Sequence, residues 1–177
     1  MICHGRIAGF ALIFTLAGCA HGGRASVEAP VARATIVNSA GATVGNATIA
    51  REGNALRVRL ELHDLSDGTH GVHLHAVGKC EGPGFASAGP HLDTGSHRHG
   101  VQNPAGPHDG DLPNVVVSGG RSVAYTAMTL RVQLESGGSA FFDADGTAIV
   151  IHANADDERT DPSGNSGARI ACGVLTR

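Results

Sequence analysis

The chain has 177 residues, of which 41% are hydrophobic and 16% are charged, so it suits one folded domain with a leader and excludes a disordered chain or a coiled coil. Its 26 glycines and 3% aromatic residues favour an all-β domain with many tight turns over a helical bundle. The formal net charge of −3, without a run of lysine or arginine, excludes an evident nucleic-acid interface.

The first twenty residues have the organisation of an export signal. Arg6 supplies a positive charge, and the apolar stretch Ile7–Leu16 follows it, which is too short for the roughly 20 apolar residues that span a bilayer. Leu16-Ala17-Gly18-Cys19 resembles the bacterial lipobox, in which the cysteine is acylated and becomes the new N-terminus. A plain secretory signal with a chance cysteine is the alternative.

These features predict three segments and a location. They are a lipoprotein signal peptide over residues 1–18, a flexible tether over residues 19–30 that begins with lipid-modified Cys19, and a folded domain over residues 31–177. The protein is expected outside the cytoplasm, tethered to a membrane by its lipid, with the periplasm as the favoured compartment.

Two cysteines remain once the leader is set aside, namely Cys80 and Cys172. A pair of cysteines in an exported domain is a reasonable disulfide, because oxidising compartments favour the bond. Two free thiols are the less favoured alternative.

Alternation of apolar and polar residues dominates the chain after the leader. In Ala55–His63, four apolar residues alternate with arginine, glutamate and histidine, which predicts a strand with one buried and one wet face. Seven further short strands are predicted at Ala34–Asn38, Ala47–Arg51, Gly71–Ala76, Asn114–Val117, Met128–Leu134, Thr147–His152 and Arg169–Leu175. Eight short strands separated by turns indicate an all-β fold, an eight-stranded Greek-key barrel or sandwich.

Two segments are predicted to be long functional loops. Residues 77–113 are rich in glycine, proline and histidine, and residues 153–168 are polar with glycine and proline. The first loop carries His91, His97, His99 and His108, with several aspartates and little apolar content. Hydrophobic burial alone cannot organise such a loop, whereas a bound metal can.

Histidines on two predicted strands add to this cluster. His73 and His75 lie two residues apart on one strand face, and His152 ends another strand, so the three can reach one metal. An H-x-H pair by itself more often means surface histidines. Three imidazoles and one carboxylate suit a closed zinc site, and an imidazole-rich set without thiolate or methionine suits copper(II) as well as zinc.

Three ordered motifs carry a family resemblance. Gly71–Cys80 resembles the copper-site strand of the copper/zinc superoxide dismutases, especially their exported bacterial branch. Ser87–Asn114 resembles the zinc loop of that family, and Gly164–Val174 resembles its C-terminal block. The resemblance covers essentially the whole mature domain, and it implies an enzyme that dismutates superoxide to dioxygen and hydrogen peroxide.

The resemblance also implies roles for individual residues. His91 would bind both metals, and Asp156 would hydrogen-bond His73 and His99, with His97 as an exposed neighbour that binds no metal. Cys80 and Cys172 match the disulfide of the family, and Arg169 would lie beside the open copper position and attract the anion. The full implied sets are copper on His73, His75, His91 and His152, and zinc on His91, His99, His108 and Asp111.

The implied cycle alternates between copper(II) and copper(I), with His91 releasing copper and taking up a proton in the reduced state.

Two departures from the family leave the implied ligands intact. Leu92-Asp93-Thr94 replaces the Phe-Asn-Pro often found after the bridging histidine, and the loop 153–168 contains no lysine. Steering of the anion by lysine, as in some members, is therefore not expected here.

Two rival functions stay open at this point. A copper- and zinc-binding module without catalysis explains the histidines, but it requires neither a bridging His91 nor an arginine beside the site. A zinc-only domain that has lost copper does not explain the intact His73, His75 and His152. The sequence leaves a homodimer possible, because bacterial members of the family occur as monomers and as dimers.

Overall fold

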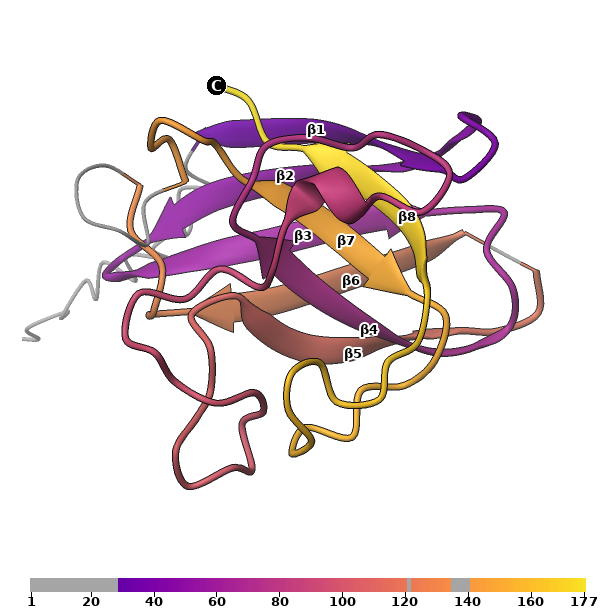
Figure 1. Cartoon of the computed structure of the whole chain (residues 1–177). Helices are drawn as coiled ribbons and strands as arrows, with labels where there is room; N and C mark the ends of the chain where they lie inside the picture. The colour runs from indigo at the N-terminus through magenta and orange to yellow at the C-terminus, as the bar shows by residue number, and fades with distance from the viewer. Residues whose placement is uncertain (1–28, 121, 135–140) are drawn as a thin grey trace, which may run out of the picture.

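Eight antiparallel strands form one sheet that curls into a nearly closed barrel (Figure 1). The structure is a computed structural model and describes residues 29–120, 122–134 and 141–177. The predicted signal peptide, Cys19 and most of the predicted tether lie outside these residues. No helix within the described ranges is long and apolar enough to cross a membrane.

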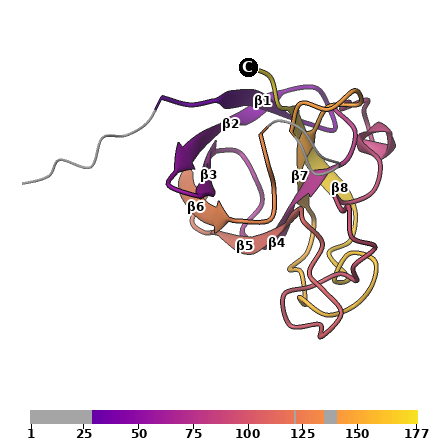
Figure 2. The ribbon, with the colours of Figure 1, turned by 90° about the vertical axis from the view of Figure 1, so that its left-hand side faces the viewer.

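The strands follow the order β5-β4-β7-β8-β1-β2-β3-β6 in the sheet. Seen end on, β5 and β6 lie side by side where the barrel closes (Figure 2). The elements are β1 Ala32–Asn38, β2 Thr43–Glu52, β3 Ala55–Leu62, β4 Gly68–His75, the 3₁₀ turn η1 Ala86–Ala88, β5 Asp111–Val117, β6 Val123–Thr129, β7 Ala148–His152 and β8 Arg169–Val174. The predicted all-β, eight-stranded fold is confirmed.

The alternation predicted for β3 is confirmed by its burial. Leu56, Val58, Leu60 and Leu62 are buried in the barrel core, whereas the residues between them reach the surface to differing extents. β4 and β7 differ, because all of β7 and the last six residues of β4 are buried. Strands buried on both faces need cover outside the barrel.

Two long loops supply that cover. The loop between β4 and β5, residues 76–110, is named here the histidine loop, and the loop between β7 and β8, residues 153–168, is named the acidic loop. Both lie on the same side of the barrel, against β4, β7 and β8 (Figures 1 and 2). The candidate site therefore lies between the barrel wall and these loops.

The sequence prediction was wrong about the sixth strand. β6 is Val123–Thr129, whereas the predicted strand was Met128–Leu134. The prediction followed four large apolar residues, but Met128 and Leu130 are exposed. β6 buries Tyr125, Ala127 and Thr129, of which only Tyr125 is large, so its inward face lacks the aliphatic signal of β3.

The predicted end of the first loop also needs correction. Residues 111–113 were predicted to belong to the loop, but they open β5. Asp111 pairs with His73 in the register between β5 and β4. This pairing brings the carboxylate of Asp111 to the strand that carries His73 and His75.

A disulfide joins Cys80 in the histidine loop to Cys172 in β8, with a sequence separation of 92 residues. Closing so long a loop lowers the entropy of the unfolded chain, which corresponds to about 4–5 kcal/mol in the chain-entropy model. We expect the double variant C80S/C172S to lose stability of that order in urea unfolding of the metal-free protein. A loss below about 1 kcal/mol would contradict this expectation. Reduced wild type is the matched control, because it lacks the bond but keeps both cysteines, and it should lose the same stability.

Candidate metal centre

Four buried histidines lie close together beside β4 and β7. His73 and His75 come from β4, His152 ends β7, and His91 of the histidine loop forms an isolated bridge with His75. One ring nitrogen of each lies within 4.8 Å of the others. These residues are named here the four-histidine group.

Hydrogen bonds determine which ring nitrogen each of these histidines leaves free. Nδ1–H of His75 donates to the carbonyl oxygen of Gly89 at 2.9 Å. Because a carbonyl oxygen only accepts, the lone pair of His75 must lie on Nε2. The nitrogens left in this way are His73 Nδ1, His75 Nε2, His91 Nε2 and His152 Nε2, and each is buried without a hydrogen-bond partner among the described residues.

A second group surrounds one carboxylate oxygen. Oδ1 of Asp111 lies 2.9 Å from Nδ1 of His91, 3.1 Å from Nδ1 of His99 and 3.4 Å from Nδ1 of His108. These four residues are named here the aspartate group. His91 belongs to both groups, since its Nδ1 faces Asp111 and its Nε2 faces the other histidines.

Distance alone also places His73 near His91, His99 and Asp111. Its hydrogen bond separates it from them, because Nε2 of His73 donates to Asp156 and only Nδ1 stays free. Nδ1 of His108 is likewise buried without a hydrogen-bond partner among the described residues. We therefore assign His108, and not His73, to the aspartate group.

The structure separates His97 from His99. His99 is buried beside Asp111, as the resemblance implies. The side chain of His97 is 43% exposed and its Nδ1 lies 2.6 Å from Oδ1 of Asp93. His97 thus lies outside both groups.

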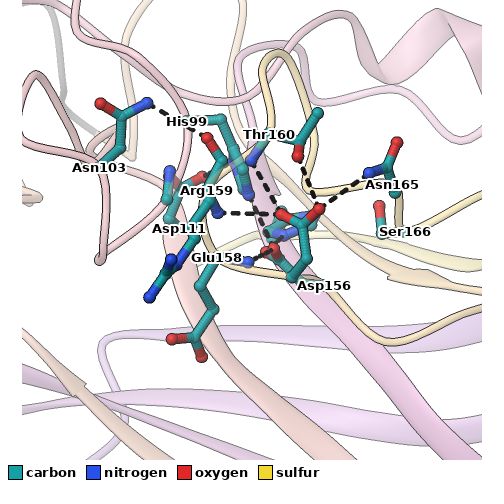
Figure 3. A network of polar contacts seen from close by, with 12 residues as sticks. His99, Asn103, Asp111, Asp156, Glu158, Arg159, Thr160, Asn165 and Ser166 are labelled. Carbon is teal, nitrogen blue, oxygen red and sulfur yellow. Dashed lines mark hydrogen bonds and ion pairs between the residues drawn. The ribbon is translucent and has the colours of Figure 1, made fainter.

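Asp156 connects the two groups from the acidic loop. Its carboxylate accepts from Nε2 of His73 at 2.7 Å and from Nε2 of His99 at 2.9 Å. Figure 3 shows His99 and Asp156 within a wider polar network, in which Asn103 of the histidine loop also donates to the carbonyl oxygen of Arg159. These contacts fasten the two loops to each other around the histidines.

A cavity of about 670 Å³ opens beside the four-histidine group. His91, His152 and Arg169 lie in its wall. The guanidinium of Arg169 donates to the carbonyl oxygens of Phe85 and Gly89, both at 2.7 Å. These bonds hold a positive charge in the wall of a cavity large enough for a small anion.

The buried histidines titrate far from their ordinary pKa in the metal-free protein. Burial lowers the pKa of His75 to about 2, of His91 to about 4 and of His152 to about 3. Burial also acts to lower the pKa of His99, but hydrogen bonds to Asp111 and Asp156 outweigh it and raise that pKa to about 9. These opposite shifts have opposite consequences for stability.

We expect the metal-free protein to be most stable near pH 6.5. A histidine with a lowered pKa takes up its proton on unfolding, so its contribution is lost as the pH falls from 6.5 through its folded pKa. The raised pKa of His99 gives stability below pH 6.5 that is lost as the pH rises through about 9. Urea unfolding in EDTA at pH 4.5, 6.5 and 9 measures both effects.

The acid side of this profile is the decisive one. An equal free energy of unfolding at pH 4.5 and 6.5 would contradict burial of neutral His75, His91 and His152. The variant H63A is the matched control, because His63 lies outside both groups. It should reproduce the wild-type profile.

The family model described as copper/zinc superoxide dismutase (SODC) matches residues 43–175. The chain belongs to the copper/zinc superoxide dismutase family. It is 38% identical to superoxide dismutase [Cu-Zn] 1 of Aquifex aeolicus over 144 residues, 80% of this chain and 85% of the relative. It is also 38% identical to superoxide dismutase [Cu-Zn] of Caulobacter vibrioides, over 81% of this chain and 84% of the relative.

A solved structure agrees with this family membership. The crystal structure of a single-residue mutant of a superoxide dismutase-like protein from Bacillus subtilis has a TM-score of 0.78 and 37% sequence identity. The similarity covers 82% of this chain and 97% of that one. The resemblance to the superoxide dismutase family is thus confirmed.

The side chains present fit the two metals of the family. A buried nitrogen without a partner is costly, and the four-histidine group has one on each of its four rings. A copper ion accepts such lone pairs. The aspartate group offers three imidazoles and one carboxylate, the donor set of a closed zinc site.

Two residues that support the site were missed in the sequence. His70 is buried with Nδ1 at 2.8 Å from the carbonyl oxygen of His152 and Nε2 at 3.0 Å from that of Ser66. In a regular strand, His70 and His73 lie on opposite faces, so strand alternation did not group them. In the structure, the register between β4 and β5 shifts just after His70. Arg131 donates to the carbonyl oxygens of His108 and Asp111, and no sequence signal could have found this contact.

Proposed function

We propose that this chain dismutates superoxide at two adjoining metal sites that share His91. The four-histidine group would hold copper, and the aspartate group would hold zinc. The observation that carries this proposal is the placement of His91, whose two ring nitrogens face two different groups. Mere storage of either metal does not require a shared imidazole.

Bound copper supplies a one-electron couple that oxidises one superoxide to dioxygen and reduces a second to hydrogen peroxide. The protein binds the anion, and His91 supplies one of the two protons that hydrogen peroxide requires, while water supplies the second. His91 lines the cavity, and its Nε2, which has no hydrogen-bond partner among the described residues, can hold a proton for the departing product. Nδ1 of His91 lies 2.9 Å from Asp111 in the metal-free structure, and zinc held between them would keep the ring oriented while that proton is held.

Arg169 would attract the substrate. Its guanidinium is fixed by two carbonyl oxygens, so its charge stays in the cavity wall without loss of side-chain entropy on binding. The formal net charge of the chain is −3, and attraction of an anion must therefore come from this local charge. Arg169 thus serves both the loop structure and the substrate.

The rival function is a metal-binding module without catalysis. The cavity beside His91 and His152, with Arg169 in its wall, favours catalysis. A binding module has no use for a fixed cation where a small anion would enter.

Zinc binding provides a test of the aspartate group. We expect H99A to bind zinc at least about tenfold more weakly, while the matched variant H97A keeps wild-type zinc affinity. Competition with a zinc chelator measures both. Equal affinities of H99A and wild type would contradict the assignment of His99.

Superoxide dismutation by the protein loaded with copper and zinc tests the function itself. Activity supports the proposal. If the protein binds one equivalent of each metal and leaves superoxide untouched, the binding-module function is the correct one.

We propose in addition that the protein is an exported lipoprotein anchored through Cys19. The lipobox-like Leu16–Cys19 supports this assignment, and the Cys80–Cys172 disulfide suits an oxidising compartment. Mass spectrometry of the N-terminal peptide tests it, and an unmodified Cys19 would contradict it.

A homodimer stays a prediction, which light scattering of the purified domain tests.

A further inference from the structure

The bond from His152 to the backbone is longer than the hydrogen bonds that hold the other three rings of the four-histidine group. His73 donates to Asp156 at 2.7 Å and His75 to Gly89 at 2.9 Å. Nδ1 of His152 lies 3.2 Å from the carbonyl oxygen of Gly167, the long end of the range for such bonds. A second acceptor at this nitrogen would therefore matter more than at the others.

Ser166 provides one. Its hydroxyl oxygen lies 3.0 Å from the same Nδ1 of His152. Because the carbonyl of Gly167 only accepts, Nδ1 carries the proton, and the hydroxyl of Ser166 must accept as well. Nε2 of His152 then keeps its lone pair, and it is one of the buried nitrogens without a partner among the described residues.

The surroundings of Ser166 hold this hydroxyl in place. Ser166 is completely buried in the acidic loop, close to Asn165 and Asp156 (Figure 3). Its backbone N–H donates to Ser163, and its carbonyl accepts from Asn154. A Cβ at Gly71 would lie 3.0 Å from Cβ of Ser166, so β4 packs directly against the serine.

We propose that Ser166 is a positioning residue of the copper site, which orients His152 through Nδ1 and increases electron donation from its Nε2. A hydrogen-bond acceptor behind a metal-binding imidazole fixes its tautomer and raises its basicity. A more basic imidazole stabilises copper(II) relative to copper(I). The proposal rests on the function proposed above, in which His152 binds copper.

The variant S166A removes the acceptor and keeps the Cβ that packs against Gly71. We expect copper(II) affinity to fall about tenfold, the low end for loss of such a partner, because the Gly167 carbonyl remains. With copper(I) affinity unchanged, a tenfold fall corresponds to a rise of about 59 mV in the one-electron potential. The copper(II) EPR spectrum should change its parallel hyperfine splitting, while zinc affinity stays at the wild-type value.

S163A is the matched control, because Ser163 contacts Ser166 through its backbone carbonyl. It should keep the wild-type spectrum and potential. If S166A does not fold, S166G carries the same test, since it also lacks the hydroxyl and offers copper no ligand.

Two different failures can be told apart. If wild type binds copper and S166A shows the same EPR spectrum and potential, the role of Ser166 is overturned and the proposed function stands. If wild type itself binds no copper, both proposals fall.

Discussion

Replacement of His152 by alanine is expected to remove copper and dismutation together while zinc binding persists. His152 offers one of the four free nitrogens of the four-histidine group and none to the aspartate group. Loss of a ligand should cost more than loss of a ligand's hydrogen-bond partner, which costs 10–100-fold. We therefore expect copper affinity and activity of H152A to fall by more than about a hundredfold.

The backbone of this variant should be preserved. The carbonyl oxygen of His152, and not its ring, bonds Nδ1 of His70, so this link between β4 and β7 survives the substitution. Metal analysis after dialysis and a superoxide assay measure the result, with H97A as the control that keeps both metals. One tight copper per chain in H152A would show that His152 is not a ligand.

Gly164→Ala is expected to damage both metal sites at once without replacing a ligand. Gly164 has a φ of +61°, and a Cβ there would lie 1.8 Å from Oδ1 of Asp156 and 2.7 Å from Nε2 of His99. The carboxylate must move, which breaks its hydrogen bonds to His73 and His99. Affinity for both metals should fall about 10–100-fold, and activity should fall with it.

A matched glycine separates this effect from backbone strain. Gly53, in the turn between β2 and β3, has a φ of +60° and nothing within 4 Å of an added Cβ. An alanine at either position costs about 1–2 kcal/mol of left-handed strain, which thermal unfolding of the metal-free variants measures. G53A should bind both metals like wild type. Equal metal affinity of G164A and G53A would rule out a role for Asp156 in orienting the histidines.

Much of this molecule could be predicted from local sequence. The alternation in β3 depends only on the two-residue period of a strand, and burial follows it residue by residue. The cysteine pair and the two long loops also needed no knowledge of the fold. Where most of the buried residues are small or polar, as in β6, the same reasoning placed the strand wrongly.

The metal cluster, likewise, could be predicted only in part from local sequence. Their residue types and the His-x-His spacing indicated a metal cluster without a structure. Reasoning from composition alone, however, did not distinguish His97 from His99, and the family resemblance was needed to choose between them. In the structure, the choice comes from burial of His99 beside Asp111 and Asp156.

Composition and short-range periodicity were enough to predict the residue types of the site, the all-β fold class and the pairing of the two cysteines. Which nitrogen of each histidine is free follows only from the hydrogen bonds of the folded chain. Those hydrogen bonds join residues far apart in the chain, 83 positions for His73 with Asp156 and 57 for His99 with Asp156. Ser166 and Arg131 support the site through loop contacts of this kind, for which no local pattern selects.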